Sequence, residues 1–231
     1  MSFEAIVLAG GLGTRLRQTV PGLPKVLAPV AGRPFIEHVL AELARGGCAR
    51  AVLAVGYLHD MVMERLGRRF DGIEIDYSIE DAPLGTGGAM RLASGMVRRQ
   101  PFFVLNGDTW LDLDHGAMLA KHRSANALLT IAVRRVPDVS RFGAVSVEGE
   151  RVVRMDEKGT DGPGLINAGV YLMHSKVLDD PRLAGAFSFE RDLLARRLSD
   201  LRPVAYEAMG RFIDIGVAED YRAAQTLLAA P

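Results

Sequence analysis

The first residues of this chain that could do chemistry follow its first apolar run. Residues 5–9 (AIVLA) lead into the sequence GGLGTRL, which begins at Gly10 and ends at Leu16. A glycine-rich turn at the end of a strand lets backbone N–H groups approach phosphate oxygens closely. A dinucleotide-binding turn would need a further glycine at position 16, and no Lys-Ser or Lys-Thr pair follows the glycines as in a Walker loop. The pattern therefore predicts a phosphate-binding turn of another kind, or an ordinary tight turn.

A second candidate group stands where another strand is expected to end. The apolar run 102–105 is followed directly by Asn106, Gly107 and Asp108. Ligands of parallel α/β sheets bind outside the carboxyl ends of the strands. Asp108 is therefore a candidate ligand for Mg²⁺, and a carboxylate that only completes a turn is the alternative.

The elements that must position these groups alternate along the first part of the chain. This alternation predicts a mixed, mostly parallel central sheet with helices on both faces. After residue 133 we expect a hairpin at 144–147 and 152–155, strands at 165–173 and 212–215, and helices at 188–198 and 218–229. Before it, strands are predicted at 5–9, 51–55, 73–78, 102–105 and 127–133, and helices at 34–44, 59–70, 86–96 and 114–124.

The composition excludes several classes of protein. The 28 Lys and Arg residues equal the 28 Asp and Glu residues, so no nucleic-acid partner is expected. The single cysteine, Cys48, excludes an internal disulfide and suits a reducing compartment. The most apolar stretch, 127–133, is far too short to cross a bilayer, and the first residues do not resemble a signal peptide. We expect a cytoplasmic protein with no membrane partner.

Two motifs together resemble a known family. The run GGLGTRL is followed by LPKVLAPVAGRP, from Leu23 to Pro34, and the pair resembles the sugar-1-phosphate nucleotidyltransferases, or nucleotide-sugar pyrophosphorylases. The family often has a proline shortly after its Arg-Leu pair, where this chain has Arg17, Gln18 and Thr19, so a slightly different loop is expected. The resemblance implies one Rossmann-like nucleotide-diphospho-sugar transferase domain over 1–231. About 1–110 would bind the nucleotide and about 111–231 the sugar.

The reaction that this resemblance implies depends on positioning and charge stabilisation. A sugar 1-phosphate attacks the α-phosphorus of a nucleoside triphosphate, and negative charge develops on the departing pyrophosphate. Arg15 would offer a planar fork to the β- and γ-phosphates, and Lys25 a compact charge to the α-phosphate. Asp108 and Asp214, the latter in the motif FIDIG, would hold Mg²⁺, which binds few protein groups and keeps several waters.

The base is predicted from the sequence EDAPLGTGGA, which begins at Glu80 and resembles the base-recognition loop of the family. Relatives that use UTP or dTTP usually carry glutamine at this position. A carboxylate only accepts hydrogen bonds, and guanine presents two adjacent donors, so Glu80 predicts GTP, with Asp81 as the alternative reader. The nucleotide-binding residues implied by the resemblance are Leu8, Gly10, Gly11, Gly13, Thr14, Glu80, Gly85 and Thr86.

The sugar phosphate is predicted to lie against three short motifs. These are RFG at 141–143, EK at 157–158 and NAGVY at 167–171, and the residues implied are Gly143, Glu157, Lys158 and Asn167. The carboxylate and amide suit sugar hydroxyls, and the lysine would neutralise the incoming phosphate. Within the family, the chain length, the Glu80-Asp81 pair and the Gly87-Gly88 pair look most like D-glycero-α-D-manno-heptose 1-phosphate guanylyltransferases. Such an enzyme would supply GDP-heptose for a bacterial surface polysaccharide.

Other functions stay open at this point. Within the family, the alternatives are a mannose 1-phosphate guanylyltransferase and an N-acetylmuramate 1-phosphate uridylyltransferase. From another class, a non-catalytic sensor of nucleotide-sugars could use the same fold. A sensor has no need of the full set formed by Arg15, Lys25, Asp108 and Asp214.

Overall fold

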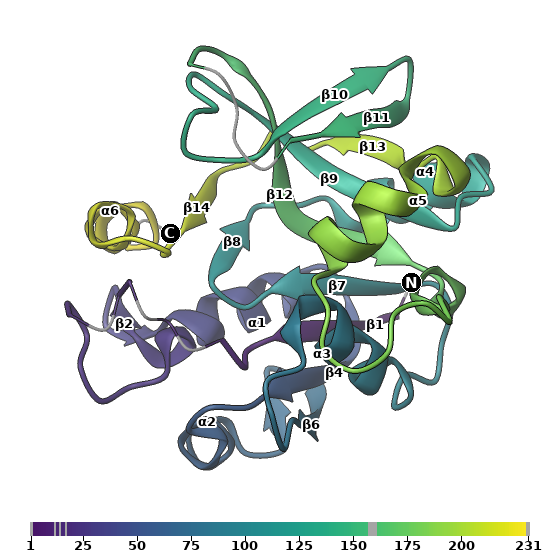
Figure 1. The fold of residues 1–231 in the computed structure, drawn as a ribbon. Helices are drawn as coiled ribbons and strands as arrows, with labels where there is room; N and C mark the ends of the chain where they lie inside the picture. Colours follow the sequence, from purple (N-terminus) through teal and green to yellow (C-terminus); the bar gives the residue numbers. More distant parts are fainter. Residues whose placement is uncertain (1, 12, 14, 17, 157–160, 230–231) are drawn as a thin grey trace.

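The computed structural model describes residues 2–11, 13, 15–16, 18–156 and 161–229, and over these residues the chain folds around one long mixed sheet. The strand order of this sheet is β10-β11-β13-β9-β12-β7-β1-β4-β6-β5. Figure 1 shows β1, β4 and β6 in the lower part of the molecule and β9 to β13 in the upper part. The chain therefore builds the sheet from its N-terminal strands at one end and its later strands at the other.

The N-terminal part of the sheet is parallel because helices connect its strands. β7 (Phe102–Asn106), β1 (Phe3–Leu8), β4 (Cys48–Val55) and β6 (Ile73–Ile79) lie side by side. The register places Leu8 beside Asn106 on one side and beside Ala54 on the other. The carboxyl ends of these strands therefore meet at one edge, where their loops can converge.

Helices cover both faces of this parallel part, as the sequence predicts. On one face, Ala5 and Val7 of β1 belong to a core that includes α1 (Phe35–Arg45) and α2 (His59–Leu66). On the other face, Ile6 belongs to a second core that includes α3 (Gly85–Ser94). Alternate residues of one strand thus fill two separate hydrophobic cores.

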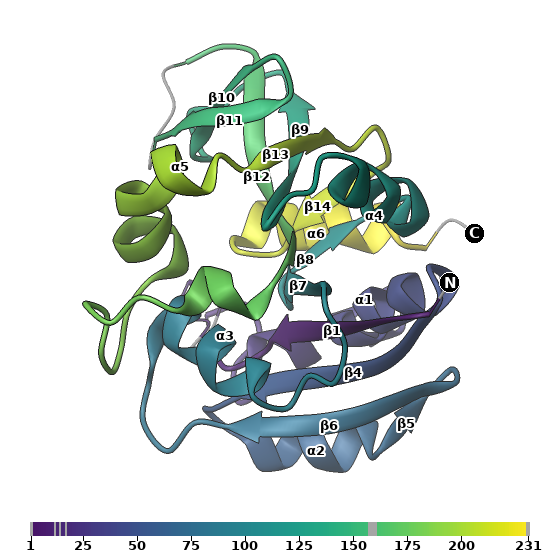
Figure 2. The same cartoon turned by 90° about the vertical axis from the view of Figure 1, so that its right-hand side faces the viewer.

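The prediction of a mostly parallel sheet is wrong for the second half of the chain. β10 (Ala144–Glu148) and β11 (Arg151–Met155) form an antiparallel hairpin because only two residues connect them. β9 (Leu129–Val136) and β12 (Gly164–Met173) are also antiparallel, whereas β13 (Val204–Glu207) runs parallel to β9. Since β10 also pairs with β12, these five strands close into a ring. Figure 2 shows the ring at the end of the molecule away from β6.

Several smaller elements also differ from the prediction. The helix expected at 59–70 ends at Leu66, and the helix expected at 188–198 starts as a π-helical segment, η3 (Phe189–Leu194), before α5 (Ala195–Leu201). Ser188 accepts a hydrogen bond from the Arg191 N–H and so caps this segment. β8 and β13 were not predicted, because strands this short carry little periodic signal. The remaining elements are η1 (Lys25–Leu27), β2 (Pro29–Val30), β3 (Arg33–Pro34), β5 (Arg69–Phe70), β8 (Thr109–Leu111), α4 (His115–Ser124), η2 (Ser175–Leu178), β14 (Phe212–Asp214) and α6 (Ala218–Leu227).

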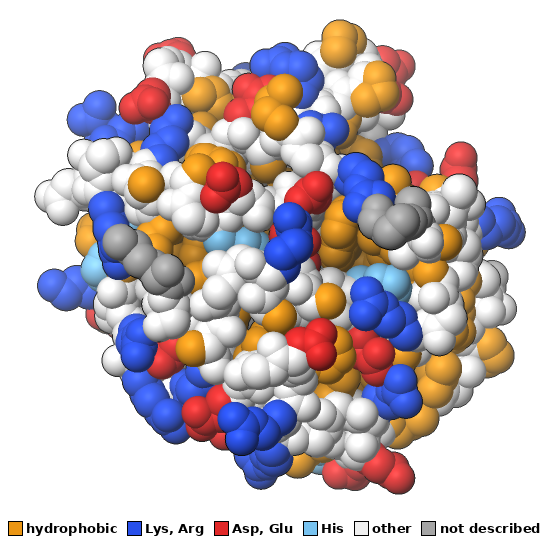
Figure 3. Space-filling view, turned by 180° about the vertical axis from the view of Figure 1, so that it is seen from behind, with side chains coloured by type: hydrophobic (Ala, Val, Ile, Leu, Met, Phe, Trp, Pro, Cys, Tyr) orange, Lys and Arg blue, Asp and Glu red, His pale blue; other side chains and the backbone are white. Residues whose placement is uncertain are grey.

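The surface is of mixed charge. The face in Figure 3 carries basic and acidic side chains interspersed, in keeping with a formal net charge of zero. Within the described part of the chain, every helix is too short or too polar to cross a membrane.

His115 is a buried histidine at the start of α4, packed between aromatic rings. Its ring centroid lies 5.1 Å from those of both Phe3 and Phe103. Neither ring nitrogen has a hydrogen-bond partner among the described residues. Burial lowers the pKa of His115 to about 4, and the nearby Arg45 guanidinium adds to the effect. His115 is therefore neutral in the folded protein at pH 5, where an exposed histidine is charged.

We expect the folded state to lose stability as the pH falls from 6.5 towards 4. In this range the unfolded chain binds a proton at position 115 and the folded chain does not, so acid favours unfolding. His115 alone should lower the free energy of unfolding by about 2 kcal/mol between pH 7 and pH 5. Denaturant titrations of the wild type and the His115→Phe variant at both pH values measure the effect. If the free energy of unfolding of His115→Phe depended on pH as strongly as that of the wild type, His115 would not be the source of the acid destabilisation.

Candidate active site

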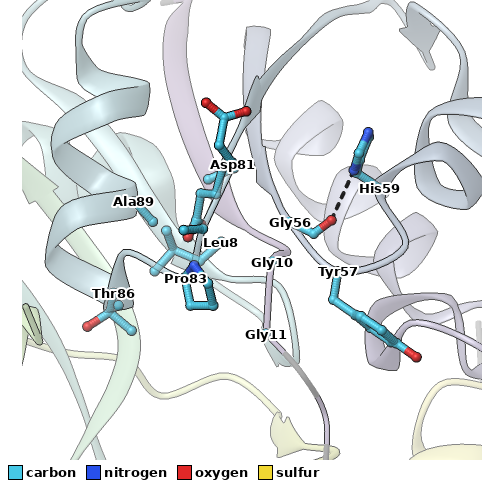
Figure 4. Close-up of a pocket in the computed structure, with 14 residues that line it drawn as sticks. Leu8, Gly10, Gly11, Gly56, Tyr57, His59, Asp81, Pro83, Thr86 and Ala89 are labelled. Atoms are coloured by element: carbon cyan, nitrogen blue, oxygen red, sulfur yellow. Dashed lines mark hydrogen bonds between the residues drawn. The ribbon is translucent and has the colours of Figure 1, made fainter. Parts of the chain in front are cut away.

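A cavity of about 540 Å³ opens where the loops after β1, β4 and β6 meet. Figure 4 shows the backbone of Gly10 and Gly11 running between Pro83 on one side and Tyr57 on the other. The structure brings six of the eight predicted nucleotide-binding residues to this cavity, namely Leu8, Gly10, Gly11, Glu80, Gly85 and Thr86.

Glu80 connects its own loop to the end of β1. Its backbone N–H donates to the carbonyl of Val55, which fixes the residue at the strand edge. One carboxylate oxygen, Oε2, accepts a hydrogen bond of 2.9 Å from the Leu84 N–H. The other, Oε1, lies over Gly10, 3.0 Å from the position that a Cβ would take there. Glu80 therefore orders the loop with one oxygen and presents the other towards the cavity.

Asp81 is placed differently from its neighbour. It is exposed, and in Figure 4 its carboxylate points away from Leu8 and Pro83. The sequence offers two acids that could bind the base. Of these, Glu80 is the one whose carboxylate lies beside Gly10, at the end of β1.

A lysine and two carboxylates meet beside the cavity. The Lys25 Nζ donates to the Asp108 Oδ2 at 2.6 Å. Asp214 reaches the same place because β14 pairs with β8, which puts Asp214 opposite Thr109. The Thr109 hydroxyl donates to the Asp214 Oδ2 at 3.1 Å, and the Ile215 N–H donates to the carbonyl of Asp108 at 3.0 Å. Asp108 and Asp214, which are far apart in the sequence, are thereby held next to one another.

The electrostatics of this cluster favour a further cation. Burial raises the pKa of Asp214 to about 6, the Asp108 carboxylate adds to the rise, and the Lys25 ammonium opposes it. Two neighbouring carboxylates suit Mg²⁺, which binds through one or two carboxylates, substrate phosphates and water. Groups of three or more His, Cys, Asp or Glu side chains that could hold a metal are absent from the described residues, so an ion at this pair would need further ligands from a bound phosphate and water.

The glycine-rich turn crosses directly over Lys25. Gly13 has a φ of +58°, and a Cβ at this position would lie 2.8 Å from the Lys25 Cβ. Only glycine adopts this conformation and this close approach without strain. Leu16 is buried and anchors the turn, while Arg15 is exposed on it. Thr14, predicted to bind the nucleotide, lies outside the described residues.

Two of the four predicted sugar-phosphate residues come together on the strands of the ring. Gly143 immediately precedes β10, and Ala144 pairs with Ile166, which places Gly143 near Asn167 on β12. The register between β9 and β12 shifts between Asn167 and Tyr171, so this part of the strand bulges. Glu157 and Lys158 lie outside the described residues.

Residues 4–230 match the family described as Nucleotidyl transferase. The chain belongs to the nucleotidyl transferase family. A D-glycero-α-D-manno-heptose 1-phosphate guanylyltransferase of Aneurinibacillus thermoaerophilus is 39% identical over 222 residues, which cover 96% of both chains. A mannose-1-phosphate guanylyltransferase of Mycobacterium tuberculosis is 35% identical over 94% of this chain and 62% of its own length. The crystal structure of HddC from Yersinia pseudotuberculosis complexed with GMP-PN has a TM-score of 0.86 and 33% identity, covering 98% of this chain and 99% of HddC.

Two residues that line the cavity of this nucleotidyl transferase were not singled out from its sequence. Tyr57 belongs to the loop after β4, His59 is the first residue of α2, and both lie across the cavity from Pro83 (Figure 4). The His59 Nδ1 donates to the Gly56 carbonyl at 3.1 Å, and its Nε2 lies 3.3 Å from the Asp60 Oδ1. The five histidines show no metal-ligand spacing, and the sequence therefore suggests only a structural or surface role for His59. Its position just after a predicted strand was the signal that could have marked it.

Proposed function

We propose that this protein joins GTP to a sugar 1-phosphate, forming a GDP-sugar and releasing pyrophosphate. The single observation that carries the proposal is the orientation of Glu80, whose Oε1 lies over Gly10 at the edge of the cavity. A guanine ring placed there can donate from N1–H and from its amine to this carboxylate. The relatives named as guanylyltransferases support the same assignment.

The phosphate end of the nucleotide is proposed to reach the cluster of Lys25, Asp108 and Asp214. Lys25 stabilises charge at the α-phosphate, and Arg15, exposed on the glycine-rich turn, binds the outer phosphates. Asp108 and Asp214 would hold Mg²⁺, which when bound neutralises charge on the phosphates. The attacking sugar phosphate is already an anion, so no side chain is needed as a strong base.

The sugar substrate is proposed to be D-glycero-α-D-manno-heptose 1-phosphate, and the product a precursor of a bacterial surface polysaccharide. The support is the relative from Aneurinibacillus thermoaerophilus, which matches over nearly the full length of both chains. Mannose 1-phosphate is the second candidate, because the relative from Mycobacterium tuberculosis aligns with almost as much of this chain. A pyrophosphate-release assay with both sugar phosphates and five nucleoside triphosphates decides which pair of substrates is used. A protein that only binds nucleotide-sugars would release no pyrophosphate with any pair.

GTP should be preferred over UTP, dTTP and ATP by at least about tenfold in kcat/KM. Uracil, thymine and adenine each turn an acceptor towards Glu80, and a carboxylate that the base covers and leaves unpaired costs about 1–3 kcal/mol. The Glu80→Gln variant should lose most of this preference. Its side-chain oxygen can keep the bond to the Leu84 N–H while its amide N–H faces the base.

The matched control is Asp81→Asn, which removes the same charge one residue away. This variant should keep the preference for GTP, because Asp81 is exposed and points away from Leu8 (Figure 4). Loss of the preference in Asp81→Asn alone would make Asp81 the reader. A wild-type protein that used UTP as well as GTP would contradict the guanine assignment itself.

A further inference from the structure

A segment of the second half of the chain lies directly on the loop that begins α3. The Phe187 N–H donates to the Leu84 carbonyl, and the Gly87 N–H donates back to the Phe187 carbonyl, both at 2.9 Å. Two residues further on, the Phe189 N–H donates to the Thr86 Oγ1, also at 2.9 Å. In Figure 2 this stretch, between β12 and α5, passes beside α3. The loop that lines the cavity is thus hydrogen-bonded to a segment about a hundred residues away.

The close fit of this contact explains two glycines of the loop. Gly85 has a φ of +69°, and a Cβ there would lie 2.6 Å from the Phe187 carbonyl oxygen. A Cβ at Gly87 would lie 2.1 Å from the Phe187 ring. The Arg91 guanidinium also lies over that ring, 4.5 Å from the ring centroid. Glycines that resemble a base-binding motif are therefore also required by a contact within the protein.

Glu190 extends this contact to the sugar-phosphate candidates. Its Oε2 accepts from the Thr86 hydroxyl at 3.1 Å, and its Oε1 accepts from the Tyr171 hydroxyl at 2.9 Å. Tyr171 is fully buried, and its hydroxyl oxygen accepts from the Asn167 Nδ2 at 2.6 Å. The Asn167 Oδ1 accepts from the Gly169 N–H at 3.1 Å. Both ends of the Asn167 amide are fixed, which leaves it one N–H and one oxygen lone pair for a ligand.

A carboxylate suits position 190 for a chemical reason. The Tyr171 hydroxyl already accepts from Asn167, so its own proton needs an acceptor, and a buried hydroxyl without one is costly. The Thr86 hydroxyl is exposed, but it already accepts from the Phe189 N–H, so it too has a proton to donate. The two oxygens of Glu190 accept one of these protons each, and a side chain with a single acceptor atom could not take both.

We propose that Glu190 is a positioning residue that couples the two substrate sites, holding Thr86 at the nucleotide and Asn167 at the sugar phosphate in a fixed relation. The inference rests on the proposed function, because that function places the nucleotide beside Thr86 and the sugar phosphate beside Asn167. Glu190 acts through these neighbours. Its loss should therefore weaken both substrates together, which a residue of only one site would not do.

The experiment compares four variants with the wild type. Tyr171→Phe removes the hydroxyl that connects Glu190 to Asn167 and leaves the contact of Glu190 with Thr86. It should therefore raise KM for the sugar phosphate about tenfold and leave the Kd of a non-hydrolysable GTP analogue within about twofold. Glu190→Ala should raise both constants about tenfold. Glu190→Gln should restore the KM for the sugar phosphate, because its carbonyl oxygen can still accept from Tyr171, and should restore the nucleotide Kd only in part, because that one oxygen cannot also accept from Thr86.

The matched control is Asp192→Asn. Asp192 accepts from the Ser188 N–H at the start of the same helical segment but does not contact Thr86 or Tyr171 in the described structure. Asp192→Asn should change neither constant, and thermal melts of all variants report any general loosening. If the wild type is active but Glu190→Ala behaves like Asp192→Asn, or shifts only one of the two constants, the coupling is wrong and the proposed function stands. A wild type inactive with every pair of substrates overturns the proposed function, and this inference with it.

Discussion

In excess chelator, we expect pyrophosphate release to fall to the background rate and to return when Mg²⁺ is added. Asp108 and Asp214 bring two carboxylates to the place proposed for a triphosphate, and Lys25 alone cannot balance both acids and the substrate. A hard divalent cation that bridges the carboxylates and the phosphates reverses this repulsion. Asp108→Asn should accordingly lower kcat by at least about a hundredfold.

The control for this variant is Asp112→Asn. Asp112 follows β8 and pairs with Arg45, so its replacement also removes a carboxylate and an ion pair from the same part of the fold. Asp112→Asn should keep near-normal kcat, and thermal melts should show both variants folded. Full turnover in excess chelator would contradict the metal site, whatever the variants do.

The sequence predicts the strand ends of the site well, for a physical reason. Leu8, Glu80 and Asp108 each stand at or just after a predicted strand, and parallel strands bring their carboxyl ends to one edge. The structure places all three at that edge, with Leu8 beside Asn106 and Glu80 bonded to Val55. Periodicity alone is enough for this part, because a buried parallel strand has a strong apolar pattern.

The pairing of Asp108 with Asp214 does not follow from any local pattern. The two acids meet because β8 and β14 pair, and each of these strands has three residues. A strand was predicted at 212–215, but β8 was not, because three residues are too few to show a strand period. Only the family resemblance therefore suggested the pair. The ring of strands escaped prediction similarly, since β13 has four residues and its partner β9 lies about seventy positions earlier.

The role of the glycines after Leu84 shows a different limit. The sequence assigns Gly85 to the base, and the structure keeps Gly85 at the cavity but also presses it against Phe187. Contacts between side chains and backbone a hundred residues apart depend on tertiary packing, which leaves no periodic signal. The same holds for Glu190, whose hydroxyl partners Thr86 and Tyr171 come from α3 and β12.

The Lys25→Ala variant is expected to lower kcat by about a hundredfold to a thousandfold, with a smaller change in the Kd of a GTP analogue. Charge grows on the phosphates as pyrophosphate departs, so an ammonium at that place contributes more to the transition state than to the bound ground state. Lys25 is well placed for this because η1 anchors it through the buried Val26 and Leu27. Single-turnover rates and analogue binding, measured on the same preparation, separate the two effects.

Lys25→Arg should not restore the rate, although it keeps the charge. The Lys25 side chain is only 13% exposed and passes under Gly13, where a Cβ would already be 2.8 Å from it, so the wider guanidinium cannot take the same place. Lys121→Ala serves as the control, because Lys121 forms an ion pair with Glu150 in the turn between β10 and β11 and does not line the cavity. Its kcat should be unchanged. A near-normal kcat for Lys25→Ala, or full recovery in Lys25→Arg, would mean that this lysine only balances Asp108 and takes no part in the transfer.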